Sequence, residues 1–468
     1  MLVPGQRVHF IGIGGVGISA IARVMLLQGY TVSGSDQQAN ALTEALAKEG
    51  ATIHQGHDPA NVGDAELVII SSAIPPDNVE VVAARRARIP VYKRADILGQ
   101  LMMGYTGVAV AGTHGKTTTT AMIVHMLIET GRDPTYIVGG VVPSTGSNAG
   151  VGRGEAFVIE ADEYDNMFLG LRPQVAVITN VEHDHPDLFP SMAAVVHAFN
   201  EFALRLPSEG LLVTCADDPA AFTLGNNRRV QNLPTISYGV HNAAADWQGR
   251  DWQPNHLGGM NFTLWYEAGR VELGRVMLRA PGLHNVQNAL AALIVMDRLG
   301  VPLGPALAAL ATFTGAQRRF DVRGRAGGVT VIDDYAHHPT AIRATLAAAR
   351  ARFPRAGIWA VWQPHTYSRL RALWEGFAGA FPPENADHVL ITDVYGARES
   401  AAAFAGEPGV ADLVAEIDHP DVRHTPGLED AVTALEAGVK AGDVVIILSA
   451  GDGPRIGEML LTSLEKKK

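Results

Sequence analysis

The chain has 468 residues, 47% of them hydrophobic, a length that predicts about two to four domains. Its formal net charge of −11 gives no electrostatic reason to expect nucleic-acid binding. The single cysteine, Cys215, excludes an internal disulfide framework and favours a reducing compartment. The sequence shows neither a signal-peptide pattern nor an apolar run long enough to span a membrane. We therefore expect a cytoplasmic protein without a membrane or nucleic-acid partner.

The first predicted unit is a strand, a glycine-rich turn, a helix and a second strand. A strand at residues 8–11 leads into the pattern G-x-G-x-x-G at residues 12–17, and a helix follows to about residue 28. Such glycines let a diphosphate approach a helix N-terminus, and Asp36 follows the second strand where a ribose-binding acid is expected. The alternative is that the glycines serve only tight packing. The pattern does not distinguish NAD from another nucleotide.

A second nucleotide-binding pattern follows a short apolar strand at residues 108–111. A glycine turn and Gly-Lys-Thr between a strand and a helix are typical of the phosphate loop of nucleoside triphosphatases. We expect Lys116 to reach the β- and γ-phosphates of ATP and the Thr117 hydroxyl to bind Mg²⁺. The ATP-binding loop comprises Gly112, Thr113, His114, Gly115, Lys116, Thr117 and Thr118. The loop is shorter than the general pattern, because Val110 stands in place of the first glycine. An ordinary glycine turn is the alternative.

Two further buried strands are predicted at residues 156–159 and 175–178. Acidic residues 160–165 follow the first, and residues 179–185, which include two histidines, follow the second. Open α/β sheets bind ligands at the carboxyl ends of their strands, so these groups are expected to complete a Mg²⁺ site with Thr117. A solvated loop is the alternative. Residues 210–276 carry turn signals and short alternating runs, which predict an antiparallel elaboration of the central domain.

From residue 329 onward, strands again alternate with helices. Polar groups follow the predicted strands at residues 329–332, 357–362, 388–392 and 443–448. We predict an α/β fold of three domains. These are an N-terminal Rossmann-like domain (residues 1–104), a central P-loop ATPase-type α/β domain with an antiparallel elaboration (105–314) and a C-terminal Rossmann-like domain (315–468).

Four stretches together resemble the Mur ligases of peptidoglycan synthesis, namely residues 112–117, 285–288, 318–321 and 333–339. The resemblance extends over essentially the whole chain. Within the family, residues 9–17 and 363–369 are similar to the branch that joins L-alanine to UDP-N-acetylmuramate. Tyr164, where that branch usually has serine, is closer to the murein-recycling branch that joins a tripeptide. We give more weight to residues 363–369, which in the family lie at the incoming amino acid.

The resemblance implies an ATP-dependent, Mg²⁺-requiring ligase that forms an amide bond. In this family the substrate carboxylate attacks the γ-phosphate, and the amine then attacks the resulting acyl phosphate. The implied partners are UDP-N-acetylmuramate, L-alanine and ATP, and the implied state is a monomer or a weak homodimer. Several sibling ligases support magnesium with a carbamylated lysine. No lysine occurs between Thr179 and Asp218, so any second Mg²⁺ must be held differently.

The resemblance also implies roles for individual residues. The catalytic candidates are Lys116, Arg319 and His338, and Arg319 is expected to reach across domains to the γ-phosphate. The Mg²⁺ ligands are Thr117, Glu160 and His185. The rest of ATP is assigned to Asn285, Asn288 and Asp334. The amino acid is assigned to Tyr335, His338, His365 and Arg369. The UDP-sugar is assigned to Gly12, Gly14, Gly15, Gly17, Asp36 and Ser72. Helix capping or local hydrogen bonding is the alternative role for His337 and His338.

Three other functions stay open at this point. The murein-recycling ligase would use a preformed tripeptide in place of L-alanine. An NAD(P)-dependent oxidoreductase would explain the first glycine pattern but not residues 112–118. A nucleotide-gated switch would hydrolyse ATP slowly without any amino acid.

Overall fold

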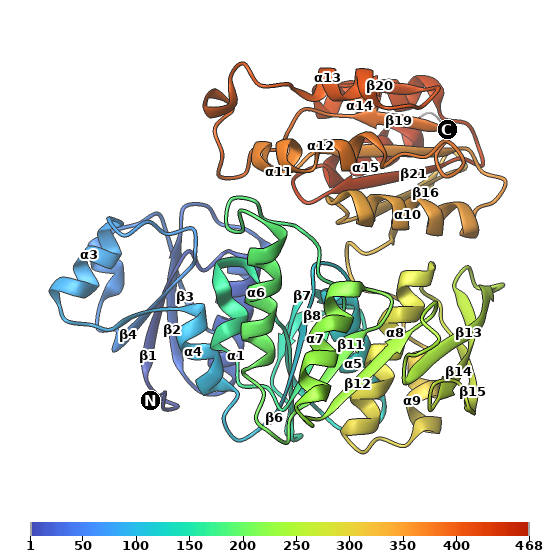
Figure 1. Ribbon diagram of the computed structural model, residues 1–468. Coiled ribbons are helices and arrows are strands. Elements are labelled where there is room, and N and C mark those ends of the chain that lie inside the picture. The colour runs from blue at the N-terminus through green and yellow to red at the C-terminus, as the bar shows by residue number, and fades with distance from the viewer. Residues whose placement is uncertain (1, 467–468) are drawn as a thin grey trace.

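Figure 1 shows a computed structural model, which describes residues 2–466 as three α/β domains. Met1, Lys467 and Lys468, at the outer ends of the first and third predicted domains, lie outside the described residues. The N-terminal domain, in blue, lies beside the central domain, and the C-terminal domain, in orange and red, lies over the central one. Among residues 2–466, no helix combines the length and the apolar character needed to cross a membrane.

The N-terminal domain is built on a parallel sheet of five strands in the order β3-β2-β1-β4-β5. The strands are β1 (Arg7–Ile11), β2 (Thr31–Asp36), β3 (Thr52–Gln55), β4 (Leu67–Ile70) and β5 (Val91–Lys93). The helices are α1 (Val16–Leu27), α2 (Ala41–Lys48), α3 (Val79–Arg86), α4 (Arg94–Leu101) and the short η1 (Pro59–Val62). Gly12 has φ +79°, a conformation that favours glycine, and it turns the chain from β1 toward α1. The predicted strand–turn–helix–strand unit is therefore present.

The central domain contains a mixed sheet of ten strands in the order β15-β14-β13-β12-β11-β10-β6-β9-β7-β8. The strands are β6 (Thr106–Ala111), β7 (Thr135–Val142), β8 (Ser147–Gly150), β9 (Ala156–Glu160), β10 (Val175–Ile178), β11 (Leu211–Cys215), β12 (Thr235–Gly239), β13 (Trp247–Pro254), β14 (Met260–Tyr266) and β15 (Val271–Met277). The helices are α5 (Lys116–Glu129), η2 (Tyr164–Gly170), α6 (Met192–Ala203), α7 (Pro219–Val230), α8 (Leu283–Arg298) and α9 (Leu303–Leu310).

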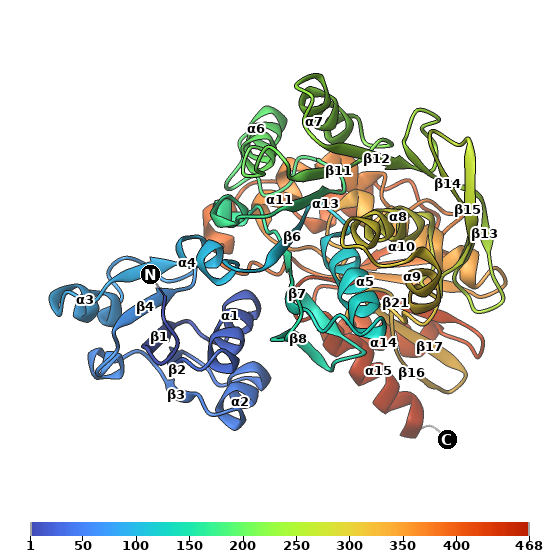
Figure 2. The ribbon, with the colours of Figure 1, turned by 90° about the horizontal axis from the view of Figure 1, so that it is seen from below.

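The antiparallel elaboration is smaller than the sequence predicted. β11 pairs in parallel with β10, and β12 pairs in parallel with β11. Within residues 210–277, only the pairs β13–β14 and β14–β15 are antiparallel. The prediction was therefore wrong for the stretch of residues 210–239, where helix α7 provides a parallel crossover. The hairpin of β7 and β8 was not predicted at all. Figure 2 shows this hairpin beside α1, where Arg23 donates a hydrogen bond to Ser147 at 2.9 Å and joins the first two domains.

Helix α5 begins at the phosphate loop and is buried over most of its length. It packs against α8, α9 and β7, so polar side chains on it need partners within the protein. Thr120 donates to the Lys116 carbonyl oxygen at 2.8 Å, and Thr119 donates to the Asn288 side chain at 3.2 Å. This packing fixes the loop and the start of the helix relative to the rest of the domain.

The C-terminal domain has six strands in the order β16-β17-β21-β18-β19-β20, and only β16 is antiparallel to its neighbour. The strands are β16 (Asp321–Ala326), β17 (Val329–Asp334), β18 (Ile358–Gln363), β19 (His388–Ile391), β20 (Val422–His424) and β21 (Val444–Ser449). The helices are α10 (Pro339–Arg352), α11 (Tyr367–Ala372), α12 (Trp374–Ala378), η3 (Ala401–Phe404), α13 (Val410–Glu416), α14 (Leu428–Gly438) and α15 (Pro454–Lys466). The carboxyl ends of β17 and β18 carry the polar segments that face the central domain.

Candidate active site

A cavity of about 1050 Å³ lies where the three domains meet. The N-terminal domain contributes the turn before α1, and the central domain contributes the phosphate loop and the segments after β9 and β10. The C-terminal domain contributes the segments after β17 and β18. The carboxyl ends of parallel strands from three separate sheets therefore open into one space, which is the expected place for ligands in α/β folds.

The phosphate loop is held against the segment that follows β10. Gly112 has φ +138°, and a side chain on it would collide with the Thr179 hydroxyl, so only glycine fits here. The His114 backbone N–H donates to the Asn180 side chain at 2.8 Å, and the Thr179 hydroxyl donates to the Ala111 carbonyl oxygen at 3.2 Å. These bonds fix the loop ahead of the N-terminus of α5, where backbone N–H groups favour anions.

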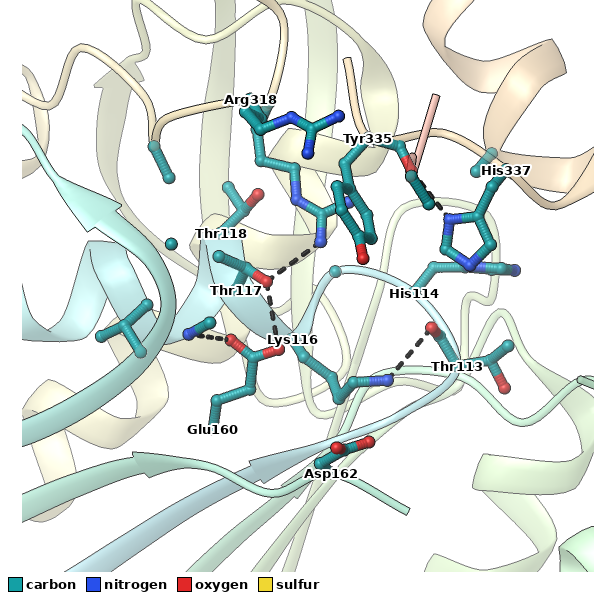
Figure 3. Close-up of a pocket in the computed structure, with 18 of the residues that line it drawn as sticks. Thr113, His114, Lys116, Thr117, Thr118, Glu160, Asp162, Arg318, Tyr335 and His337 are labelled. Atoms are coloured by element: carbon teal, nitrogen blue, oxygen red, sulfur yellow. Dashed lines mark hydrogen bonds between the residues drawn. The ribbon is translucent and has the colours of Figure 1, made fainter. Parts of the chain in front are cut away.

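Lys116 is held in this structure by a carboxylate that the sequence did not single out. Its Nζ donates to Glu163 Oε2 at 2.9 Å and to the Gly112 carbonyl oxygen at 2.5 Å. Burial alone would lower the pKa of Lys116, but the attraction of Glu163 and the neighbouring acids raises it above its usual value. The ammonium is therefore charged at neutral pH. Figure 3 shows the Lys116 side chain beside the loop, with Asp162 below it.

Thr117 connects two groups that come from different parts of the chain. Its hydroxyl donates to Glu160 Oε1 at 3.1 Å, and Glu160 Oε2 accepts from the Gly139 N–H at 2.7 Å (Figure 3). Arg319, which lies between the second and third domains, donates to the same Thr117 hydroxyl at 3.1 Å. Oxygen donors of this kind fit Mg²⁺. His185 instead approaches Glu163, with Nε2 at 3.6 Å from Oε1, so it reaches the Lys116 side of the cavity.

A buried ion pair joins the central and C-terminal domains at the other end of the cavity. Arg369 Nε donates to Asp184 Oδ1 at 2.7 Å, and its Nη1 lies 3.0 Å from His365 Nδ1. Burial alone would raise the pKa of Asp184, but His185 and Arg369 hold it well below its usual range. Burial and Arg369 lower the pKa of His365 to about 4. Arg369 already pairs with the Asp184 carboxylate, so the carboxylate of a bound amino acid would have to share the Arg369 guanidinium with Asp184.

His338 caps a helix and His337 makes a local hydrogen bond, which are the alternative roles that the sequence left open for them. His338 is the N-cap of α10, and its Nδ1 accepts from the Thr340 N–H at 3.3 Å. Burial and the nearby His114 lower the pKa of His338 to about 4, so the imidazole is neutral at neutral pH. His337 Nδ1 lies 2.8 Å from the carbonyl oxygen of Tyr335, whose ring faces the guanidinium of Arg319 at 5.1 Å.

The residues assigned to the rest of ATP are joined by hydrogen bonds on α8. Asn288 donates to Asn285 at 3.1 Å, and Asn285 donates to the Pro281 carbonyl oxygen at 2.7 Å. Both asparagines line the cavity near the phosphate loop. Asp334 also lines it, but its two oxygens accept from the backbone N–H groups of Phe320 and Ala336 at 2.7 and 2.9 Å. In this structure Asp334 therefore fixes the segment around Phe320, through which the chain enters the C-terminal domain.

Family models account for most of the chain. The Mur ligase family catalytic domain matches residues 7–106, the Mur ligase middle domain matches 110–296, and the Mur ligase glutamate ligase domain matches 318–451. The chain is 46% identical to a UDP-N-acetylmuramate–L-alanine ligase of Roseiflexus sp., over 98% of this chain and 99% of the relative. It is 44% identical to the enzyme of that name from Salinibacter ruber, over 98% and 95%.

The chain belongs to the Mur ligase family. Among solved structures, it is similar to the UDP-N-acetylmuramate–alanine ligase MurC of Thermotoga maritima, with a TM-score of 0.81 and 29% identity over 99% of this chain and all of the other. It is also similar to a murein peptide ligase of Psychrobacter arcticus, with a TM-score of 0.72 and 26% identity over 98% and 99%. The three-domain α/β fold predicted for this Mur ligase is confirmed.

In the N-terminal domain of this Mur ligase, only part of the predicted UDP-sugar set lines the cavity. Gly15, Gly17 and Ser72 line it, together with Arg94, whose guanidinium lies 3.5 Å from the Ser72 hydroxyl. Gly12, Gly14 and Asp36 do not line it. Asp36 instead accepts from the Gly14 N–H at 2.8 Å and so stabilises the turn. The sequence did not single out Arg94, a cation well placed for a diphosphate.

One acidic segment of the central domain, residues 160–165, contacts both the N-terminal and the C-terminal domain. Lys93 of the N-terminal domain pairs with Asp165 at 3.0 Å. From the C-terminal domain, Arg398 lies 4.8 Å from the ring centroid of Tyr164. The same segment carries the carboxylates that contact the phosphate loop. The tyrosine that departs from the usual serine therefore contributes to an interdomain contact, worth about 0.5–2 kcal/mol for a cation over a ring.

Proposed function

We propose that this Mur ligase joins L-alanine to the carboxylate of UDP-N-acetylmuramate, with cleavage of ATP to ADP and phosphate, in peptidoglycan synthesis. The single observation that supports this most is the shared cavity, in which a phosphate loop meets a cationic segment from each neighbouring domain. Curated relatives that are 40–46% identical over nearly the whole chain carry this activity in their names.

The reaction needs activation because a carboxylate and an ammonium do not condense in water. The carboxylate oxygen of UDP-N-acetylmuramate attacks the γ-phosphorus, the bond to ADP breaks, and an acyl phosphate forms. The L-alanine nitrogen then attacks the acyl carbon, and phosphate leaves with the former carboxylate oxygen. Lys116 and Arg319 stabilise the charge on the transferring phosphoryl group, and their fixed positions avoid reorganisation during the reaction.

Mg²⁺ would be held by Thr117 and Glu160, whose oxygens lie 3.1 Å apart, with His185 on the adjacent side. When bound, the ion neutralises phosphate charge as a Lewis acid. The Arg319 guanidinium also reaches Thr117, whether or not an ion is bound. Because Arg319 lies outside the central domain, this contact exists only when the C-terminal domain is close to the central domain. Closure therefore assembles the phosphoryl-transfer site and excludes water from the acyl phosphate.

The C-terminal domain receives the amino acid. Arg369 lines the cavity, but its Nη1 donates to His365 and its Nη2 lies 3.4 Å from His185 Nδ1, so the substrate carboxylate would share the guanidinium with these residues and with Asp184. His338 and His365 have low pKa values and are therefore neutral imidazoles. Their Nδ1 atoms already accept from the Thr340 N–H and from Arg369 Nη1, so each ring carries its proton on Nε2, and His365 can donate that proton in a hydrogen bond to the amino-acid carboxylate.

The murein-recycling activity is the second candidate, because Tyr164 and the Psychrobacter arcticus structure point to that branch. The test is to incubate the enzyme with ATP, Mg²⁺ and UDP-N-acetylmuramate, and to offer L-alanine, L-serine, glycine or L-alanyl-γ-D-glutamyl-meso-diaminopimelate. We expect L-alanine to give the largest kcat/KM, with a product whose mass is that of the two substrates minus water. A larger kcat/KM for the tripeptide would overturn the proposal in favour of recycling. The same panel run without UDP-N-acetylmuramate should give no ADP.

A further inference from the structure

A cluster of two histidines and one glutamate lies at the edge of the cavity, apart from the Thr117–Glu160 pair. His114 belongs to the phosphate loop and Glu182 to the segment after β10, both in the central domain. His338 begins α10 of the C-terminal domain. Among residues 2–466, these three form the group whose His, Cys, Asp or Glu donor atoms all lie within 4.8 Å of one another. The ring centroids of His114 and His338 lie 4.6 Å apart, with the ring planes tilted by 50°.

The spacing of these donors fits a tetrahedral metal ion. His114 Nε2 lies 3.4 Å from Glu182 Oε2, and His338 Nδ1 lies 3.5 Å from the same oxygen. Two ligands bound to Zn²⁺ at its usual bond lengths lie about 3.3–3.5 Å apart at a tetrahedral angle. Both distances between a histidine nitrogen and the Glu182 oxygen therefore match the ligand-to-ligand distance at Zn²⁺ before any ion binds. The two imidazole nitrogens lie within 4.8 Å of each other, and a closer approach of the two would complete the three-ligand set, with water as the fourth ligand.

The surroundings hold the donors in the form that binds a metal. The Thr340 hydroxyl donates to Glu182 Oε2 at 2.8 Å, as an outer-shell group orients a ligating carboxylate. Burial alone would raise the pKa of Glu182, but the hydrogen bond with His114 and the other contacts lower it to about 2. His338 is neutral as well, and its Nδ1 carries no proton because it accepts from the Thr340 N–H at 3.3 Å; a bound ion would replace that hydrogen bond.

The chemistry of the donors indicates which ion would bind. Mg²⁺ prefers oxygen ligands and keeps much of its water, whereas imidazole nitrogen suits Zn²⁺ and similar first-row transition metals. We propose that His114, Glu182 and His338 bind a transition-metal ion of the Zn²⁺ type, and that this ion joins the C-terminal domain to the phosphate loop. Because the ligands come from two domains, the ion stabilises the closed arrangement and slows the opening that turnover requires. The site differs from the Mg²⁺ site, and its existence does not depend on the identity of the amino acid.

The first test measures binding of Zn²⁺ itself to the full-length, metal-free protein, by competition with a chromophoric chelator in millimolar Mg²⁺. We expect one Zn²⁺ per chain, and at least about tenfold weaker binding in each of His114→Gln, Glu182→Gln and His338→Gln, since even outer-shell changes cost 10–100-fold. His424→Gln is the matched control, because His424 pairs with Asp393 at 2.8 Å without a third donor. It should bind Zn²⁺ as the parent does.

A second measurement keeps the proposal testable if one variant is poorly folded. Zn²⁺ should raise the unfolding temperature of the parent and of His424→Gln, and should raise it less in Glu182→Gln. Crystals soaked with Zn²⁺ should give an anomalous peak among the three side chains. Absence of stoichiometric binding in the presence of Mg²⁺, or equal Zn²⁺ affinity in the parent and all three ligand variants, would overturn the proposal.

Discussion

Replacing Lys116 by alanine should lower the rate of amino-acid-dependent ADP formation by about 10²–10³-fold or more, the usual cost of removing one preorganised charge from a transition state. Lys116 lies at the phosphate loop, whereas the N-terminal lining of the cavity comes from other segments that include Ser72 and Arg94. Binding of UDP-N-acetylmuramate should therefore stay within a few-fold of the parent. Steady-state kinetics and calorimetric titration of the UDP-sugar measure the two effects separately.

The Lys116→Ala variant needs a control for stability. Glu163 is buried and would lose its partner, and breaking a buried pair can cost about 3–5 kcal/mol. The double variant Lys116→Ala/Glu163→Gln removes the unpaired charge and should be equally inactive but more stable. Lys440→Ala changes an exposed lysine of the C-terminal domain and should behave as the parent. Equal loss of catalysis and of UDP-sugar binding in Lys116→Ala would contradict the separation of the two sites.

Replacing Arg319 by alanine should reduce kcat by about 10³-fold or more, because arginines supplied to a transferring phosphoryl group are worth 10³–10⁵. The guanidinium reaches the Thr117 hydroxyl at 3.1 Å from outside the central domain, so it acts after closure, and ATP affinity should change much less than kcat. Arg319→Lys should recover only part of the rate, since lysine lacks the planar fork. Stopped-flow measurement of ATP binding together with kcat tests this split.

Arg323 offers the matched control for Arg319. It pairs with Asp321 at 3.2 Å within the C-terminal domain and makes no contact with the phosphate loop. Arg323→Ala should therefore keep nearly full activity. An Arg319→Ala enzyme with the parent's kcat, or with loss confined to ATP affinity, would contradict a role in the transition state.

Much of the fold followed from local sequence patterns. The glycine turns at residues 12–17 and 112–118 each follow a buried strand and precede a helix, and these short-range signals predicted both units correctly. The hairpin of β7 and β8 and the parallel pairing of β11 and β12 were missed. Pairing of short strands depends on distant partners, and alternation alone does not tell a parallel neighbour from an antiparallel one.

The sequence predicted the site residues whose chemistry follows from their type. It did not predict which side chains face the cavity, because the backbone conformation decides that orientation. The segment 160–165 has several carboxylates, and the sequence does not show which of them faces Lys116. Asp165 and Asn166 adopt positive φ values of +56° and +53°, which turn the chain sharply after Glu163. Likewise, Asp36 and Asp334 looked available for ribose but are bound to backbone N–H groups of loops whose shape only the fold defines.

In the proposed reaction, the carboxylate of UDP-N-acetylmuramate is activated by phosphorylation and then captured by L-alanine. The most direct measurement uses UDP-N-acetylmuramate with ¹⁸O in both carboxylate oxygens, followed by mass analysis of the released phosphate and of the product. The mechanism predicts one ¹⁸O in each phosphate and one retained in the amide carbonyl, with ADP formation beyond one per active site only when L-alanine is present. Phosphate without ¹⁸O, released at the same rate with and without L-alanine, would contradict it and indicate simple hydrolysis of ATP.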